Sequence, residues 1–247
     1  MGGVRRYLAI SLKFNKNKND KYLTTYVKHV IMRLELKSDS NKEDKNDVRI
    51  FLDCDDTIIN SSECIIDLLN KKNGTNKTIK DLKDFHYRSI DKTLTNEDVV
   101  KLFESDDFWN SVNYNNEFLN TKDFIDSNFD VTVVTCGTEL NLKKKANKLN
   151  SIGYGTGYNF VGILIKDDLN LCKKCIDMHL GIQIDDNMSS IENTNAAVKI
   201  LFQNNNNFTW NRPKPNIDNL YIAQTWEEIR QILEFFKKNP EFICKGY

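Results

Sequence analysis

VRIFLDCDDT, residues 48–57, is a short apolar run that ends in three acidic residues and a threonine. A run of this length and composition is typical of a strand that is buried on both faces of a parallel sheet. We therefore predict a central strand here. Its polar residues should stand at the carboxyl end, where parallel α/β sheets bind ligands.

Further apolar runs follow the first one along the chain. They are VTVVT (131–135), FVGILI (160–165), GIQID (181–185), VKILF (198–202) and the weaker LYIA (220–223). Helical patterns separate several of them, at 140–149, 172–180 and 226–238, and the last opens with a Thr225–Glu228 capping box. Strands that alternate with helices predict an α/β fold: a Rossmann-like parallel sheet with helices on both faces.

The interval from Ile58 to about Asn120 contains no convincing strand. Ser61 or Ser62 could cap a first helix, and Thr95 with Asp98 forms a capping box before a second. We expect a helical cap over 61–120, inserted after the first core strand, and a catalytic core over 47–60 and 121–247. Residues 1–46 are a Lys/Asn-rich leader of unknown role. Their last part, 38–47, has no apolar residue and is interpreted as a linker, and a small hairpin or short helix could precede it.

Composition limits the function classes. The chain has 247 residues, 40% of them hydrophobic, and 35 basic residues balance 35 acidic ones. This is room for one domain plus an insertion, with no global field that attracts nucleic acid or an anionic membrane. The apolar stretch 7–12 is too short for a secretory signal or a membrane span. We expect a soluble, cytoplasmic protein without membrane or nucleic-acid partners.

Two local features have plain interpretations. The six cysteines do not resemble a disulfide scaffold, and Cys172 and Cys175 form a single CxxC, so we expect ordinary reduced cysteines rather than zinc or a redox pair. The lysine run 143–145 favours a solvated helix face, with contact to a polyanion as the alternative.

Acidic or hydroxylic residues end the strands that should carry chemistry. The first ends in Asp53, Asp55 and Asp56, the second in Thr135, Cys136, Gly137 and Thr138, and the fourth in Asp185, Asp186 and Asn187. Carboxylates gathered at one edge repel each other unless a hard cation lies among them, and Mg²⁺ prefers such oxygen ligands. Thr135, the backbone amides of 136–138 and Lys174 could then bind a phosphate. The set predicts phosphoryl transfer.

These residues also carry a family resemblance. DCDDT (53–57), the strand-ending Thr135, Lys174 and the Asp185–Asp186 pair resemble the four ordered motifs of the haloacid dehalogenase (HAD) superfamily. More narrowly, ESDDFWNSV (104–112), KCIDM (174–178), GIQIDDN (181–187) and TWEEI (225–229) resemble its 5′(3′)-deoxyribonucleotidase-like branch. The likeness covers roughly residues 48–235.

The resemblance implies a role for each motif residue. Asp53 would be the nucleophile that forms an aspartyl-phosphate, and Asp55 the acid/base. Mg²⁺ would be held by the Asp53 carboxylate, the Asp55 carbonyl and Asp185, with Asp186 in support. Thr135, Cys136, Gly137 and Lys174 would bind the phosphoryl group. Two positions depart from the branch: Asp56 stands where Gly is usual, and Cys136 where Ser is common.

The expected substrate is a nucleoside monophosphate, with Phe85 and Trp109 of the cap as candidate stacking surfaces for its base. Three alternatives stay open. They are another small phosphoester, a phosphoprotein or nucleic-acid end (disfavoured by a cap that covers the site), and a catalytically silent nucleotide- or phosphate-binding module (disfavoured by an intact Asp55). Base preference, 5′ versus 3′ specificity and oligomeric state stay undetermined at this stage.

Overall fold

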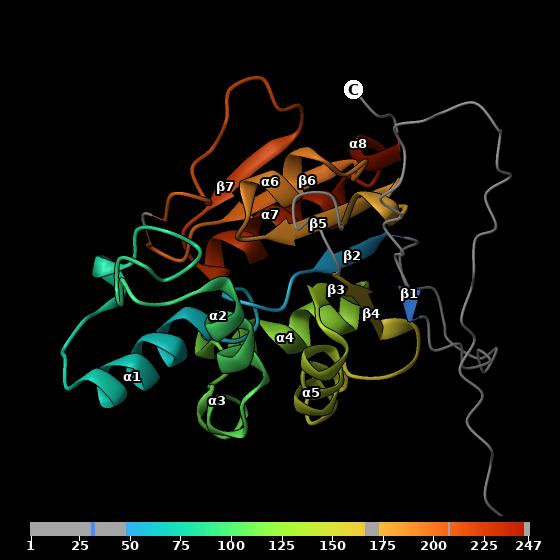
Figure 1. Ribbon diagram of the computed structural model, residues 1–247. Coiled ribbons are helices and arrows are strands. Elements are labelled where there is room, and N and C mark those ends of the chain that lie inside the picture. The colour runs from blue at the N-terminus through green and yellow to red at the C-terminus, as the bar shows by residue number, and fades with distance from the viewer. Residues whose placement is uncertain (1–30, 33–47, 166–172, 207, 245–247) are drawn as a thin grey trace, which may run out of the picture.

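The computed structural model describes residues 31–32, 48–165, 173–206 and 208–244 (Figure 1). The predicted linker 38–47 and most of the leader lie outside these residues. Ile31–Met32 of the leader form strand β1, which pairs antiparallel with β4.

A seven-stranded sheet organises the described part of the chain, in the order β1-β4-β3-β2-β5-β6-β7. Every pairing except that of β1 is parallel. The strands are β2 (Arg49–Leu52), β3 (Asp130–Gly137), β4 (Phe160–Leu164), β5 (Gly181–Asp185), β6 (Val198–Phe202) and β7 (Leu220–Ala223). The six predicted strands and the α/β class are confirmed.

The central position of β2 creates the site. The chain runs from β2 outward through β3 to β4 and then returns to the other side of β2 with β5. In parallel sheets ligands bind where the strand order reverses in this way, beyond the carboxyl ends of the strands. The ends of β2, β3 and β5 therefore meet at one point.

Helices cover the sheet. They are α4 (Asn116–Asn128), α5 (Glu139–Asn150), α6 (Met188–Glu192), α7 (Trp226–Lys238) and α8 (Glu241–Cys244), with a 3₁₀ turn η2 (Gly157–Asn159). α4 packs on α7 and β3, and Trp226 fills the joint with its ring 4.9 Å from that of Phe118 and 5.5 Å from that of Phe202. Trp226, Ile229, Leu233 and Phe236 form the buried stripe of α7, because apolar residues recur at its helical spacing.

The segment between β2 and β3 is helical, and its last helix, α4, begins within the interval 61–120 predicted for the cap but packs on the core. α1 (Ser61–Asn73), the 3₁₀ turn η1 (Ile79–Asp81), α2 (Asn96–Glu104) and α3 (Asp106–Ser111) form a group beside the sheet, at the lower left of Figure 1, which we call the cap. Its own core is aromatic, with the Phe103, Phe108 and Trp109 rings in contact. The Thr95–Asp98 capping box of α2 is confirmed.

Three local predictions are corrected. α1 has Asn60 at its N-cap, without a side-chain hydrogen bond, because the hydroxyls of Ser61 and Ser62 bond to acidic residues of the site instead. The Thr225 hydroxyl accepts from the amide of Glu228, but the Glu228 carboxylate accepts from Gln224, so the second capping box is incomplete. The helix expected over 172–180 is, in its described part, a single 3₁₀ turn at 173–175, and Leu180 at φ 60° cannot continue a right-handed helix.

None of the helices in the described part of the chain combines the length and apolarity that a bilayer-spanning segment needs.

Candidate active site

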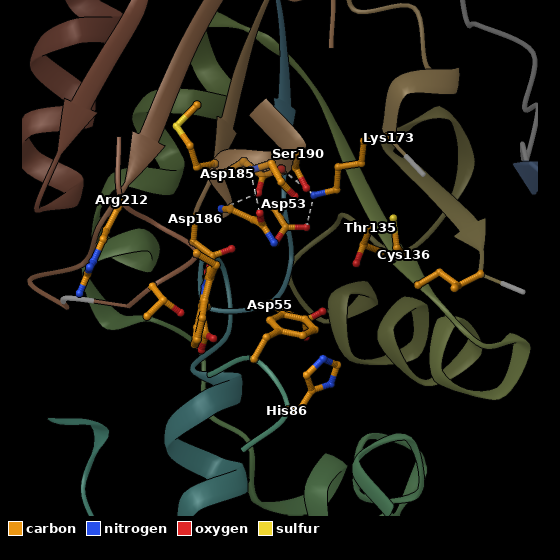
Figure 2. A pocket seen from close by; sticks show the side chains of 18 of the residues that line it. Asp53, Asp55, His86, Thr135, Cys136, Lys173, Asp185, Asp186, Ser190 and Arg212 are labelled. Atoms are coloured by element: carbon orange, nitrogen blue, oxygen red, sulfur yellow. Dashed lines mark hydrogen bonds and ion pairs between the residues drawn. The ribbon is translucent and has the colours of Figure 1, made fainter. Parts of the chain in front are cut away.

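Asp53 follows directly on β2 and is held by its backbone. Its amide donates to the carbonyl of Ile184 at 2.9 Å, which extends the pairing of β2 with β5 by one residue. The side chain is 8% exposed and accepts a hydrogen bond from Lys173 at 2.5 Å. A buried carboxylate paired with a lysine therefore faces the cavity at the end of the central strand (Figure 2).

Asp185 ends β5 and shares the same lysine. Lys173 donates to Asp185 at 2.7 Å, Gln183 Nε2 donates to it at 3.1 Å, and the amide of Asn187 at 2.9 Å. Asp186 follows, buried, and accepts from the indole N–H of Trp210 at 2.8 Å. The predicted meeting of the first and fourth strand ends is thus present.

The lysine in this site is Lys173, and the prediction of Lys174 is wrong in position. Lys173 is 5% exposed and touches Asp53 and Asp185, whereas Lys174 is exposed to solvent. The 3₁₀ turn at 173–175 directs adjacent side chains in different directions, so only one of two neighbouring lysines can reach the strand ends. Burial opposes the charge on Lys173, but Asp185 and Asp53 together raise its pKa, so it stays an ammonium group.

Three carboxylates can share a cation. One oxygen each of Asp53, Asp185 and Asp186 lies within 4.8 Å of the others, and all three residues are buried. Burial raises the pKa of Asp53 to about 6, with Lys173 acting in the opposite direction and Asp185 in the same one. Burial and then the neighbouring Asp56, Asp53 and Asp185 raise the pKa of Asp186 well above its ordinary value. Crowded buried carboxylates of this kind fit a hard divalent cation such as Mg²⁺.

Asp55 lies on the other side of the cavity, toward the cap. One carboxylate oxygen accepts from Ser61 Oγ at 2.7 Å and the other forms an ion pair with Lys145. In Figure 2 His86 of the cap faces the same space. The two aspartates of the first motif thus have separate surroundings, one toward Asp185 and one toward the cap.

Asp56 occupies a left-handed backbone conformation, with φ 51°. Glycine adopts this region without strain, and aspartate is among the side chains that tolerate it best. The Asp56 carboxylate accepts from the amide of Ser62 at 2.7 Å and also from its hydroxyl, which lies 3.1 Å from Tyr87 Oη. Burial raises its pKa to about 7 despite the bonds from Ser62. The extra acid ties the motif to the cap.

The end of β3 supplies the predicted phosphate-binding residues. Thr135 is buried, with Oγ1 2.9 Å from Lys145 Nζ, and it lines the cavity together with Cys136. β3 continues to Gly137, and α5 begins at Glu139, one residue before the predicted pattern 140–149, with Thr138 at its N-cap. A Cβ at Gly137 would come within 2.2 Å of Asn141 Oδ1, so any larger residue there would have to displace the Asn141 side chain.

The cysteine prediction needs one correction. Cys54 and Cys64 are buried thiols and Cys175 is an exposed cysteine outside any disulfide, but Cys136 is disulfide-bonded. Its sulfur therefore has no hydrogen to offer a phosphate, and only its backbone can serve the predicted role.

The lysine run 143–145 does not form a uniformly solvated face. The Lys143 side chain is 59% exposed and pairs with Glu139, and Lys144 bonds to the carbonyl of Glu104 and to Asp106. Lys145 is buried between Asp55 and Thr135. A sequence signal existed, because Lys145 stands three residues after Leu142 and four before Leu149, on the buried stripe of α5.

Two cavities adjoin at these residues. The larger measures about 620 Å³ and is lined by the residues of the strand ends, by Phe85, His86 and Tyr87 of the cap, and by Trp210 and Arg212. The smaller, about 370 Å³, runs between α2 and the start of α5 and reaches Asp55 and Lys145. Phe85 lines both.

Only one of the two predicted stacking residues borders the cavities. Phe85 is 46% exposed, with its ring 5.7 Å from that of Trp210. Trp109 packs on Phe108 inside the cap and donates its N–H to the carbonyl of Phe103, so it lines neither cavity. Trp210, which sequence reasoning missed, takes its place on the wall.

Solved structures share this architecture. The HAD-hydrolase YfnB of Bacillus subtilis, whose structure contains magnesium, aligns with 76% of this chain and 99% of its own at 14% identity and a TM-score of 0.50. The chain has the haloacid dehalogenase fold.

Two further structures with this fold are similar to the chain. A haloacid dehalogenase-like hydrolase of Xanthomonas campestris aligns with 80% of this chain and 99% of its own at 8% identity and a TM-score of 0.48. A predicted phosphatase from Clostridium acetobutylicum aligns with 76% and 98% at 15% identity and a TM-score of 0.47. No family model matches the sequence, and no curated protein does.

Proposed function

We propose that this protein is a Mg²⁺-dependent phosphomonoesterase of the haloacid dehalogenase superfamily, which hydrolyses nucleoside monophosphates through an aspartyl-phosphate. The observation that carries the proposal is the Asp53–Asp185–Asp186 cluster beside Lys173, at the point where β2 and β5 end in a cavity. The magnesium in the YfnB structure supports the choice of cation.

The carboxylates Asp53, Asp185 and Asp186 would hold Mg²⁺, with the main-chain carbonyl of Asp55 as a further ligand. When bound, the ion neutralises charge on the phosphoryl oxygens and lowers the repulsion between two anions, the substrate and Asp53. Lys173 supports both effects, because it is already held between Asp53 and Asp185 as a fixed positive charge.

The first chemical step transfers the phosphoryl group to the protein. The Asp53 carboxylate attacks phosphorus, the bond from phosphorus to the leaving oxygen breaks, and Asp55 gives that oxygen a proton. Thr135 Oγ accepts from Lys145, so its own hydrogen is free to bond to a phosphoryl oxygen.

The second step restores the protein. Asp55, now ionised, takes a proton from water, the water oxygen attacks phosphorus, and the acyl-phosphate bond to Asp53 breaks to release inorganic phosphate. Separate surroundings for the two aspartates suit separate roles, since Asp53 pairs with Lys173 and Asp55 with Ser61 and Lys145.

The nucleoside preference is supported by the walls of the larger cavity. Phe85 of the cap and Trp210 of the core meet edge to face and together form one aromatic part of the wall, and base stacking on such a surface tolerates different bases. Arg212 and polar residues of α6 line the same cavity and suit a polar sugar. Another small phosphoester is the second candidate, because the aromatic surface at the cavity is small.

A substrate panel tests the proposal. Deoxy- and ribonucleoside monophosphates, a sugar phosphate and a phosphopeptide are incubated with the full chain, with and without Mg²⁺, and released phosphate is measured. We expect Mg²⁺-dependent hydrolysis of nucleoside monophosphates and, for a folded Asp53→Asn variant, no turnover above background. Binding without hydrolysis of any ester would instead support a silent binding module.

A further inference from the structure

Lys145 is a buried cation in a place that a helix normally gives to an apolar side chain. Its side chain is 2% exposed, although it belongs to the middle of an amphipathic helix whose other lysines reach solvent. A buried ammonium group is costly unless its charge is balanced and its hydrogens are bonded. Its partners therefore indicate why it is there.

All three hydrogens of Lys145 have acceptors in the site. They are a carboxylate oxygen of Asp55, Thr135 Oγ1 at 2.9 Å and the main-chain carbonyl of Cys136 at 2.9 Å. Three acceptors match the three donors of an ammonium group, so the side chain has one favourable arrangement. Lys145 thus links the loop after β2 to the end of β3.

The link fixes two groups that act on the substrate in the proposed reaction. Asp55 Oδ2 and Thr135 Oγ1 both lie within hydrogen-bond reach of one nitrogen, so the acid/base is held beside a proposed phosphate ligand. Ser61 holds the other Asp55 oxygen, at 2.7 Å. Without Lys145, the Ser61 hydroxyl would be the one side-chain donor left to this carboxylate among the described residues.

Lys145 is unsuited to act as the proton donor itself. Its three hydrogens are all matched by acceptors within the site, Asp55, Thr135 and the carbonyl of Cys136. A group held in this way can orient its neighbours, but it has no spare hydrogen to give to a leaving oxygen.

We propose that Lys145 is a positioning residue, which holds the Asp55 carboxylate against the Thr135 end of the phosphoryl site and so aligns it with the leaving oxygen. The inference rests on the proposed phosphoester hydrolysis, and it adds the residue that fixes the position of the general acid, Asp55. Loss of Lys145 should matter in proportion to how much the leaving group needs a proton.

The test compares Lys145→Met with Lys143→Met, its matched control on the exposed side of the same helix. Both are assayed with Mg²⁺ on aryl phosphates of graded leaving-group acidity, from phenyl phosphate to 2,4-dinitrophenyl phosphate. kcat/KM is the quantity to compare, because it includes phosphoryl transfer to Asp53 and excludes the later hydrolysis step. A well-placed general acid contributes about 10²- to 10⁴-fold.

We expect Lys145→Met to lose about 100-fold in kcat/KM on phenyl phosphate and less than about 5-fold on dinitrophenyl phosphate, which departs without protonation. Lys143→Met should stay within about 2-fold of the wild type on both. An equal loss of Lys145→Met on both esters would overturn the positioning role and leave only a structural one.

A second pair of variants keeps the test decisive if Lys145→Met folds poorly with Asp55 unpaired. The double variant Asp55→Asn/Lys145→Met removes both buried charges together, and Asp55→Asn is its reference. If Lys145 acts through Asp55, the double variant should match Asp55→Asn within about 2-fold on phenyl phosphate. A further 10-fold loss would contradict the inference. A wild type that hydrolyses no ester would instead refute the proposed function, and the inference with it.

Discussion

Lys173 and Lys174 are neighbours in sequence with opposite surroundings. The first is buried against two carboxylates and the second is in solvent. No apolar periodicity surrounds them, so the sequence offers no basis for choosing one. The choice depends on the direction in which a 3₁₀ turn presents each side chain.

Matched substitutions separate the two lysines. Lys173→Met should lower kcat/KM by about 100-fold or more, because it removes a fixed positive charge beside Asp53, the proposed nucleophile. Lys174→Met should stay within about 2-fold. Activity is measured on a nucleoside monophosphate with saturating Mg²⁺, after circular dichroism shows that both variants are folded. A larger loss for Lys174→Met would restore the original assignment.

The position of a residue in the sequence pattern also decides which of the other site residues could be predicted. Asp53, Asp55, Thr135, Asp185 and Asp186 were predictable because each ends or follows an apolar run, and the structure brings them to one edge. Lys145, Ser61 and Trp210 were missed because their contacts join segments far apart in sequence. Phe85 was chosen well for a place on the cavity wall, and Trp109 was not, since an aromatic residue in a small insertion packs more readily into its own core. Their catalytic and binding roles stay predictions.

At the scale of elements, the cap is joined to the core by polar contacts around α5. Thr138 of the core bonds to Glu104 at the end of α2, Asn141 Nδ2 donates to the carbonyl of Phe103 at 3.0 Å, and Lys144 reaches the carbonyl of Glu104 at 2.7 Å. On the far side Thr209 donates to the carbonyl of Lys83 at 3.0 Å. The position of α2 thus sets the shape of both cavities.

The N-capping residues of two helices, one in the helical cap and one in the core, allow a matched comparison. Thr95 caps α2 and Thr225 caps α7, each by accepting from the amide three residues on. Alanine at either position should cost about 1 kcal/mol of helix stability. Amide hydrogen exchange should then quicken in α2 for Thr95→Ala and in α7 for Thr225→Ala. Unchanged exchange in α2 would show that its capping box contributes nothing to the cap.

Strands were easier to predict than helices for a physical reason. The central strands β2, β3, β5 and β6 are almost entirely buried and consist of nearly continuous apolar runs, whereas the segment at 172–180 has mixed polarity and ends at a left-handed Leu180. Capping signals located α2 and α7 but not α1, because Ser61 and Ser62 bond to the acidic loop instead.

At the scale of the molecule, several buried carboxyl groups lie close together at one edge of the sheet. The pKa values of Asp53, Asp56 and Asp186 are all raised, chiefly by burial. A carboxyl group with a raised pKa binds protons in the folded state at pH values where the unfolded chain has lost them. Each such group therefore lowers the free energy of unfolding of the metal-free protein as the pH rises from about 4 through about 7.

Magnesium should reverse that trend. Because the ion binds the ionised carboxylates, we expect it to raise the Tm by several degrees at pH 8 and by clearly less at pH 5.5, where protons compete. Differential scanning fluorimetry with and without Mg²⁺ at both pH values measures this. Asp186→Asn should raise the Tm of the metal-free protein at pH 8 and reduce the effect of Mg²⁺. An equal Mg²⁺ effect at both pH values would count against the carboxylate cluster as its site.

The most direct test of the central claim is to trap the covalent phosphate. Asp55→Asn keeps the proposed nucleophile and removes the proposed base for the second step. With this variant, 2,4-dinitrophenyl phosphate labelled at phosphorus should leave the label on the protein after rapid acid quenching. The account predicts one label per chain, released by hydroxylamine as an acyl phosphate is, on the peptide that contains Asp53. Turnover by the wild type with no label on that peptide, or a label on another residue, would contradict it.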